Sequence, residues 1–436
     1  MRPSADLTVA RPPVTMAVMD TLPGANTSIW WREPVPEFPV LLGELDAEIV
    51  VIGGGITGVT LGYTLAQQGA VVAVIEGARI AGSASGRNAG FLLAAPAEPY
   101  RENIAMWGRE SARANLLIGR RSHQRIQELV ESLGLDCDYR VNGSLRLART
   151  EEEAEDQRAS LPELHADGFK MLETQLAGTA PAGCEDRFAA AFVTAEDGEI
   201  HPVRFLHQLA EAAVKVGARF YEHSPVTVAR WNGGLWTVRT PQGEVRARTV
   251  VIATNAHAPL LVPALTPLIA PRRGQMLATA PLEREVAPRP TYAHWGYHYW
   301  RQLPDSRLVM GGWRDIDPDA EAGFADQTTG PIQRAIEDGL RQLVPEGAVI
   351  ESRWAGIMGF ARDGRPLVGW LDPEHHVAIC AGYTGHGLGL AAACTQDLAA
   401  LLAWKEAPGI ATFDPTRFPE LRRSREPLVA LGVAAG

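Results

Sequence analysis

Apolar and polar positions follow two different patterns along this chain, and the first predicts two strand–turn–helix units. An apolar strand at residues 49–52 is followed by a glycine turn, a helix at about 56–68 and a second apolar strand at 71–75. Near the other end of the chain, an apolar strand at 377–381 leads through another glycine turn into a helix at about 387–404. Continuous apolar strands beside helices are typical of an α/β architecture.

The second pattern is the alternation of antiparallel strands. Residues 226–253 contain three such strands, separated by the turn signals Asn232-Gly233-Gly234 and Pro241-Gln242-Gly243, and predict a small antiparallel meander. Residues 297–313 alternate on either side of Pro304-Asp305-Ser306 and predict a hairpin. The remaining periodic segments predict helices at about 101–133, 151–168 and 201–216.

The two patterns interrupt each other, which indicates two interwoven domains with a ligand cleft between them. We expect an N-terminal extension and aromatic lead-in at residues 1–45. The predicted α/β domain comprises residues 46–98, 200–256 and 354–436, and the predicted antiparallel-sheet domain comprises residues 99–199 and 257–353.

Composition and charge exclude several classes of partner. The net charge of −10 over 436 residues, without a basic stripe, argues against a nucleic-acid partner. The four cysteines show no metal-ligand spacing, so we expect no metal site, and they are typical of reduced thiols in a cytoplasmic protein. No signal-peptide pattern is present, and no apolar stretch is long enough to predict a membrane span.

Three glycines in the first turn follow the G-x-G-x-x-G spacing of a dinucleotide site. Gly53 permits the tight turn, Gly55 lets a pyrophosphate approach the backbone, and Gly58 lets the helix pack closely on the strand. The free N–H groups and the dipole at the helix start then bind the pyrophosphate. Glu76 ends the second strand at about the offset of an acid that hydrogen-bonds ribose hydroxyls. A glycine-rich turn without a ligand is the alternative.

Two further glycine-rich segments favour FAD over NAD. The segment SASGRNAG (residues 83–90) follows soon after Glu76, where an NAD-binding domain would continue into another strand and helix. A flavin needs such a loop to extend from its pyrophosphate to its ring. At the other end of the chain, AGYTGHGLG (residues 381–389) presents a second helix start, whose N–H groups suit the flavin edge that becomes anionic on reduction. A buried helix with a glycine turn before it is the alternative for this segment.

The chain resembles the D-amino-acid oxidase, glycine oxidase and sarcosine oxidase superfamily of FAD-dependent amine oxidoreductases. The resemblance covers about residues 28–405 and includes, besides the segments above, VVIATNAHA (250–258) and WAGIMGFARDGRPLVG (354–369). The loop at 83–90 and the ATNAHA strand end are most similar to the γ-glutamylputrescine oxidoreductase-like branch. The resemblance implies a discontinuous Rossmann-like FAD-binding domain and an interwoven antiparallel-sheet substrate domain.

The resemblance also implies which residues bind the cofactor. Residues of the first unit are implied to hold the ADP half, the loop to line the pyrophosphate and flavin, Val226 to meet the adenine, and the second helix start to face the flavin pyrimidine. The implied FAD-binding residues are Gly53, Gly55, Ile56, Thr57, Gly58, Glu76, Ser85, Arg87, Asn88, Ala89, Gly90, Val226, Gly385, His386, Gly387 and Leu388.

Three departures from the superfamily bear on the substrate and the acceptor. Met358 stands where glycine oxidases carry an arginine for the substrate carboxylate, and the lysine that sarcosine oxidases use would fall near Gly389. No lysine lies on the 297–313 hairpin, so the usual oxygen-activating lysine is absent. No cysteine lies between Cys184 and Cys380, so we expect non-covalent FAD. The departures argue against glycine and sarcosine as substrates.

The predicted chemistry needs orientation more than acid–base catalysis, because the hydride passes directly from the amine carbon to flavin N5. Arg301 is the candidate carboxylate anchor, with Tyr299 and Trp313 beside it on the hairpin and His386 near the flavin carbonyl. A surface charge is the alternative for Arg301, and a backbone-bound helix start is the alternative for His386. The aromatic run on the hairpin predicts either an amine cage or ordinary sheet packing; it comprises His294, Trp295, Tyr297, Tyr299 and Trp300.

The sequence therefore predicts an FAD-dependent oxidoreductase that oxidises the C–N bond of a small-molecule amine or amino acid. The electron acceptor is oxygen or another carrier, and the missing lysine favours slow use of oxygen. The alternatives are an NAD-only dehydrogenase, a tRNA-modifying flavoprotein of the same fold, and a non-catalytic flavin-binding protein. The charge and the two flavin-type segments argue against the first two.

Overall fold

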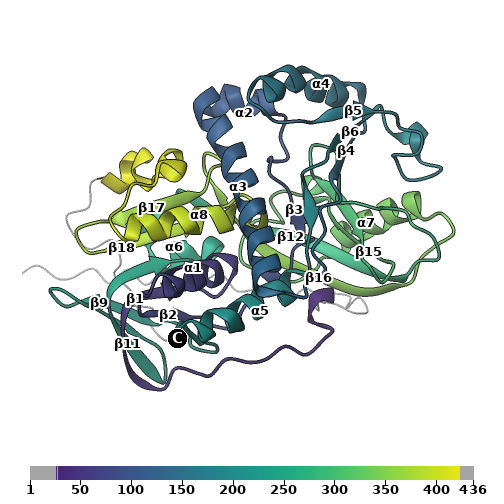
Figure 1. The fold of residues 1–436 in the computed structure, drawn as a ribbon. Coiled ribbons are helices and arrows are strands. Elements are labelled where there is room, and N and C mark those ends of the chain that lie inside the picture. The colour runs from purple at the N-terminus through teal and green to yellow at the C-terminus, as the bar shows by residue number, and fades with distance from the viewer. Residues whose placement is uncertain (1–25, 27, 423–436) are drawn as a thin grey trace, which may run out of the picture.

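A computed structural model describes residue 26 and residues 28–422 of the chain, and Figure 1 shows its course. Two eight-stranded sheets lie in different halves of the molecule, with helices packed against each. The predicted extension before residue 26 lies outside the described residues. The aromatic lead-in packs on the body as predicted, since Trp30 is almost fully buried. No helix within the described part of the chain is long and apolar enough to cross a membrane.

The first sheet has a parallel centre and antiparallel additions at its edges. Strand β1 pairs in parallel with β11 and β2, β18 joins β11 in parallel, and β8 joins β2 in parallel. The central strands are buried on both faces where they carry continuous apolar runs. In spatial order the strands are β17 (Leu367–Asp372), β18 (Val377–Ala381), β11 (Gly243–Ile252), β1 (Gly43–Ile52), β2 (Val72–Ile75) and β8 (Arg219–Tyr221), with β10 (Trp236–Arg239) and β9 (Val228–Trp231) attached to β11 as the predicted meander.

Helices α1 (Ile56–Gln67) and α8 (Gly387–Leu402) lie side by side against this sheet (Figure 1). The Thr395 hydroxyl donates to the Thr60 hydroxyl between them at 3.0 Å. The two helices follow strands β1 and β18, which both run in the direction of β11. Because the carboxyl ends of parallel strands lie at one edge of a sheet, both helices begin at that edge.

The second sheet is antiparallel except for the pair formed by β13 and β4. The predicted hairpin is confirmed as β14 paired with β15. In spatial order the strands are β16 (Ile350–Ala361), β12 (Ile269–Pro281), β15 (Arg307–Gly312), β14 (His298–Gln302), β13 (Thr291–Ala293), β4 (Ser144–Ala148), β6 (Ala190–Thr194) and β5 (Leu172–Thr174).

The remaining helices cover the sheets or connect the two halves. Helix α7 contributes its apolar face to the core of the second sheet, and the long α3 packs beside α8 (Figure 1). These helices are α2 (Tyr100–Trp107), α3 (Arg109–Leu133), α4 (Glu151–Ala166), α5 (Pro202–Lys215), α6 (Ala258–Leu261) and α7 (Gly330–Leu343).

Two local predictions need correction. The helix expected at about 101–133 is two helices, because Gly108 adopts a positive φ of 78° and ends α2. The Gly, Ala and Ser content of residues 77–96 predicts a loop throughout, but this segment contains a short strand, β3 (Phe91–Leu92), which pairs with β7 (Gly198–Glu199). The domain boundaries stay a prediction; β16 belongs to the second sheet, although residues 354–361 fall within the predicted α/β domain.

Candidate active site

A cavity of about 880 Å³ opens at the edge where α1 and α8 begin. Its wall includes both glycine turns, with Gly53 and Gly55 from the first and Gly385 and Gly387 from the second. The volume falls in the range of about 300–1,000 Å³ that is usual for ligand sites. The two ends of the chain thus contribute to one site.

The first turn is packed so closely that larger residues are excluded. A Cβ on Gly53 would lie 2.7 Å from the Ala253 carbonyl oxygen, and a Cβ on Gly58 would lie 1.8 Å from the Gly53 carbonyl oxygen. Gly55 caps α1 without a side chain, and the Ile56 N–H donates to the Ser85 hydroxyl at 2.9 Å. Apart from that bond, the start of α1 has no side-chain cap and is bare towards the cavity.

Glu76 lies at the carboxyl end of β2 and lines the same cavity. Its carboxylate accepts hydrogen bonds from the Gly54 N–H at 2.7 Å and from the Ala78 N–H at 2.8 Å. Burial raises the pKa of this carboxyl, and the two N–H groups act in the opposite direction. Val226 lines the cavity as well.

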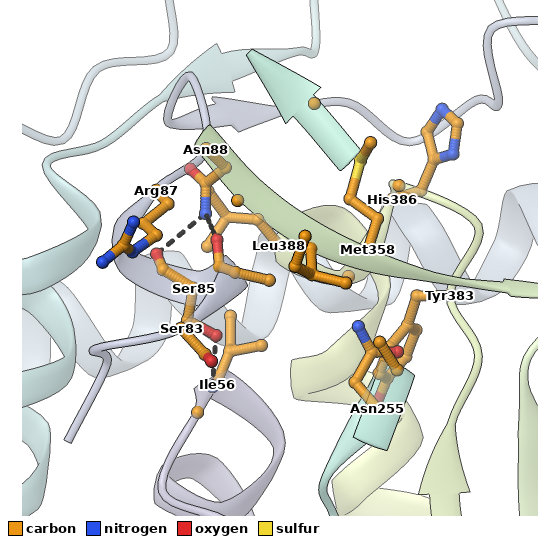
Figure 2. A pocket seen from close by; sticks show the side chains of 18 of the residues that line it. Ile56, Ser83, Ser85, Arg87, Asn88, Asn255, Met358, Tyr383, His386 and Leu388 are labelled. Atoms are coloured by element: carbon orange, nitrogen blue, oxygen red, sulfur yellow. Dashed lines mark hydrogen bonds between the residues drawn. The ribbon is translucent and has the colours of Figure 1, made fainter. Parts of the chain in front are cut away.

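The loop at residues 83–90 is held rigidly along one side of the cavity (Figure 2). The Asn88 side-chain amide donates to the Ala84 and Ser85 carbonyls at 3.1 and 2.8 Å, and its oxygen accepts from the Gly90 N–H at 2.7 Å. The Arg87 guanidinium donates to the Ala355 carbonyl at 2.8 Å, which ties the loop to β16. These bonds fix the loop before any ligand binds.

Tyr383 and Asn255 lie on the other side of the cavity, with Met358 and His386 above them in Figure 2. The Tyr383 hydroxyl is 2.9 Å from the Thr57 hydroxyl, and the Asn255 side-chain oxygen accepts from the Gly382 N–H at 3.0 Å. His386 places Nδ1 3.0 Å from the Thr384 carbonyl, while its Nε2 is buried without a hydrogen-bond partner. Burial lowers the pKa of His386, so the ring is neutral at pH 7.

The rest of the wall is aromatic and carries one cation that the predictions missed. Tyr299 and Tyr297 face the cavity, and the Arg314 guanidinium lies 4.6 Å from the Tyr297 ring centroid and 5.4 Å from that of Phe360. No carboxylate of the described residues forms an ion pair with Arg314. Its charge is therefore available to a ligand.

The structure places most of the predicted site residues on this one cavity. Those that line it are Gly53, Gly55, Ile56, Thr57, Glu76, Ser85, Arg87, Asn88, Ala89, Val226, Tyr299, Gly385, His386, Gly387 and Leu388. Gly58 and Gly90 lie behind the wall, and Arg301 and Trp313 do not reach the cavity.

The proposed anchor role of Arg301 does not agree with this geometry. The Arg301 guanidinium is buried 3.3 Å from the Glu199 carboxylate, donates to the Ile200 carbonyl at 2.9 Å, and lies 5.1 Å from the Trp30 ring centroid. A Cβ on Gly90 would lie 2.6 Å from this guanidinium, so Arg301 packs behind the loop. Its charge is already neutralised within the protein.

Trp313 and part of the aromatic run also point elsewhere. Trp313 stacks on His298 with ring centroids 4.0 Å apart and packs on α7 at Gly339. Of the run, Trp295, Tyr297 and Tyr299 line the cavity, whereas Trp300 is buried in the core of the second sheet. The alternation along β14 sends neighbouring side chains to opposite faces.

Sequence reasoning missed several cavity residues. Thr254 and Asn255 lie two and three residues beyond the carboxyl end of the parallel strand β11, a position that favours ligand contact and could have identified them. Arg314 lies in a short turn after β15, Glu98 in the segment before α2 and Glu102 in the first turn of α2, and a single charge at such positions has no distinctive pattern.

Comparisons with known proteins agree with this arrangement. Residues 48–401 match the family model described as DAO, FAD dependent oxidoreductase. The chain is 28% identical over 424 residues to γ-glutamylputrescine oxidoreductase of Escherichia coli strain K12, which covers 91% of this chain and 93% of that protein. It is 25% identical over 366 residues to glycine oxidase of Bacillus subtilis strain 168, with coverages of 82% and 94%.

Solved structures share the fold. L-Proline dehydrogenase from P. horikoshii superposes with a TM-score of 0.74 at 24% identity, covering 87% of this chain and 99% of that one. Glycine oxidase from Geobacillus kaustophilus superposes with a TM-score of 0.73 at 24% identity, covering 86% and 99%. The predicted fold class, a Rossmann-like part with an antiparallel-sheet part, is confirmed.

Proposed function

We propose for this chain, which belongs to the DAO family of FAD dependent oxidoreductases, a substrate that joins a reactive primary amine to an amino-acid head group. The general activity follows from the family and its members: the chain is an FAD-dependent oxidoreductase of amines or amino acids. The finer substrate class rests on the charged groups around the cavity.

The residues present fit FAD. The bare starts of α1 and α8 offer backbone N–H groups, and the glycines of the first turn leave space that a Cβ would fill. We propose that α1, Ser85 and the loop at residues 83–90 hold the pyrophosphate, and that the segment at Gly385–Leu388 holds the flavin pyrimidine. None of the four cysteines lines the cavity, which supports non-covalent binding.

Bound FAD supplies the hydride acceptor. The chain must then orient an uncharged amine and exclude water from it. Tyr299 and Met358 both lie against Gly274. A Cβ added to Gly274 would lie 3.6 Å from the Tyr299 hydroxyl and 3.0 Å from the Met358 methyl, so the two side chains are neighbours. Neither side chain carries a charge near pH 7, so this pair supplies no charged partner to a carboxylate and suits an unsubstituted amine end.

The charges around His386 carry the proposal. Glu98, Arg314 and His386 all line the cavity, so a carboxylate and a guanidinium are both available there. Burial lowers the pKa of His386, Glu98 opposes this shift and Arg314 adds to it. Glu102 lines the same cavity, and its pKa is raised by burial and by the nearby Asp156 and Glu98 carboxylates. An amino-acid head group offers a carboxylate to Arg314 and an ammonium to Glu98 and Glu102.

The relative named for γ-glutamylputrescine supports this assignment. A γ-glutamyl amide of a diamine carries an α-carboxylate and an α-ammonium at one end and a free primary amine at the other. The head group would bind at Arg314 and the two acids, and the free amine would extend towards Tyr299 and Met358.

A matched panel of amines tests the proposal. The holoenzyme is mixed anaerobically with γ-glutamylputrescine, putrescine or glycine, and flavin reduction is followed at the visible absorbance of the cofactor. We expect the first compound to reduce the flavin with a kcat/KM at least tenfold above the other two. Equal or faster reduction by putrescine would show that the head group is not recognised.

Removing the Arg314 charge should affect only substrates with a carboxylate. Arg314→Met removes a charge-assisted interaction of about 1.5–3 kcal/mol, so we expect KM to rise roughly 10- to 100-fold. Arg362→Met is the control, since Arg362 also stacks on an aromatic ring, Phe418, but lies outside the cavity. A KM for putrescine that rises by the same factor in Arg314→Met would contradict the anchor role.

The acceptor is tested on the same reduced enzyme. None of the three lysines lines the cavity, so we propose slow reoxidation by oxygen and faster reoxidation by another electron carrier. Air and an artificial quinone are admitted separately to the reduced enzyme. Rapid recovery of flavin colour in air, without benefit from the quinone, would identify an oxidase.

A further inference from the structure

Three side chains with metal-ligand chemistry meet beside the cavity wall. His294 follows β13, His298 begins β14, and Asp315 follows β15. His294 Nε2 lies 3.3 Å from one Asp315 carboxylate oxygen, and His298 Nε2 lies 3.9 Å from the other. One ligand atom from each residue lies within 4.8 Å of those of the other two. This grouping is separate from the residues that line the cavity.

Two atoms of this group lack the partners that buried polar atoms normally have. His298 is only 5% exposed, and its Nε2 has no hydrogen-bond partner. Asp315 Oδ1 is also buried without a partner, and it is the oxygen that faces His298. Leaving such atoms unpaired costs about 1–3 kcal/mol each, so their arrangement points to a missing ligand.

The separations suit a shared ion better than direct hydrogen bonds. At 3.9 Å the His298 and Asp315 atoms are too far apart to bond to each other. Two ligands of a tetrahedral zinc ion, at bond lengths of about 2.0–2.2 Å, lie about 3.4 Å apart. The observed spacings of 3.3 and 3.9 Å bracket that value.

The backbone around the group is held in conformations that favour glycine. His294 and Trp313 have positive φ angles of 53° and 57°, and neither residue is glycine. Trp313 stacks on His298 and so fixes the imidazole plane. Such conformations cost about 1–3 kcal/mol each and cluster at functional sites.

The charges nearby would balance a divalent cation. Asp315 and the buried Glu153 carboxylate, which accepts from the Trp295 N–H at 2.7 Å, are both close to His294. Arg149 opposes them, with its Nη1 3.3 Å from His298 Nδ1. To bind a metal ion through Nε2, His298 must carry its proton on Nδ1, the atom that Arg149 contacts. Arg149 is exposed, so its side chain can move into solvent and leave Nδ1 free for that proton.

We propose that His294, His298 and Asp315 bind one divalent transition-metal ion, with Zn²⁺ the best match and solvent in the remaining position. Two imidazoles and a single carboxylate suit zinc, whereas Mg²⁺ and Ca²⁺ require mostly oxygen ligands. The ion would join the turn at Trp295–Tyr297 to the segment at Arg314, both of which line the cavity. This site goes beyond the amine oxidation proposed above and does not depend on it.

Metal titration of the holoenzyme tests the site. The protein is treated with EDTA and dialysed, then titrated with ZnCl₂ by calorimetry and with CoCl₂ by visible absorption. We expect one equivalent of Zn²⁺ to bind at least tenfold more tightly than Mg²⁺. Bound Co²⁺ should give the d–d absorption band that is typical of a cobalt ion with a low coordination number.

Variants identify the ligands. His294→Ala and Asp315→Asn change partly exposed residues and should weaken Zn²⁺ at least tenfold, whereas Arg149→Met should strengthen it. His375→Ala is the control, because His375 also pairs with an aspartate, Asp372 at 2.8 Å, but belongs to no group of three metal-ligating side chains among the described residues. The proposal fails if no saturable Zn²⁺ uptake occurs, or if His294→Ala and Asp315→Asn bind Zn²⁺ as the unmodified protein does.

Discussion

At the scale of single residues, Arg301 shows how burial decides what a charge can do. The same residue type at Arg314 is free for a ligand, whereas Arg301 is enclosed by Glu199, Ile200 and Trp30. We expect Arg301→Met to lower the free energy of unfolding by about 3 kcal/mol, the lower end for a broken buried ion pair, because Arg140 still contacts Glu199. Urea unfolding of the holoenzyme measures this loss.

Arg140→Met is the matched control, since Arg140 pairs with the same carboxylate from a half-exposed position. It should destabilise the protein less than Arg301→Met. Neither variant should change the KM ratio between γ-glutamylputrescine and putrescine. A selective rise in KM for the carboxylated compound in Arg301→Met would restore the anchor role that the sequence suggested.

At the scale of elements, short-range patterns predict more than long-range packing does. The strands and helices around both glycine turns are confirmed, because their apolar runs and glycines act within a few residues. Tyr299 and Arg301 occupy the same face of β14, so the alternation of the hairpin predicts the same orientation for both side chains. Only Tyr299 reaches the cavity, because Trp30 and the loop at residues 83–90 cover Arg301. No short-range sequence pattern predicts that these segments cover Arg301.

The bare start of α1 leads to a prediction about cofactor affinity. A Cβ on Gly55 would lie 2.9 Å from the Ser85 hydroxyl, at the proposed pyrophosphate position. We expect Gly55→Ala to weaken FAD at least tenfold in a fluorescence titration of the apoprotein. Gly330→Ala is the control: Gly330 begins α7, and its Cβ would likewise lie 2.9 Å from a side-chain atom, Arg334 Nη1, away from the cavity. Equal losses would indicate a general folding effect.

At the scale of the whole molecule, the site depends on segments that span most of the chain. Cavity residues run from Ile52 to Gly389 and come from both sheets. The parallel strands bring the starts of α1 and α8 to one edge, β14 of the second sheet supplies Tyr299, and the turn after β15 supplies Arg314. The cofactor half could be predicted because its motifs are local; the substrate half depends on how the two sheets meet.

The enclosed wall also determines how activity should depend on pH. Burial lowers the pKa of His257 and His386 from 6.5 and raises the pKa of Tyr299 and Tyr383 from 10.0. Above its lowered pKa an imidazole is neutral, and below its raised pKa a phenol is neutral. These four groups therefore keep one charge state between pH 7 and 9.

None of these four groups supplies the titration, so we assign the proton that must leave before hydride transfer to the substrate ammonium. We expect kcat/KM to rise about tenfold per pH unit until the pH reaches the pKa of the free substrate amine, because kcat/KM reports the free enzyme and free substrate. Two substrates whose amine pKa values differ by about one unit should give midpoints that differ by the same amount. A common midpoint for both substrates, displaced in His386→Asn, would instead assign the titration to the protein and give His386 a direct part in deprotonating the amine.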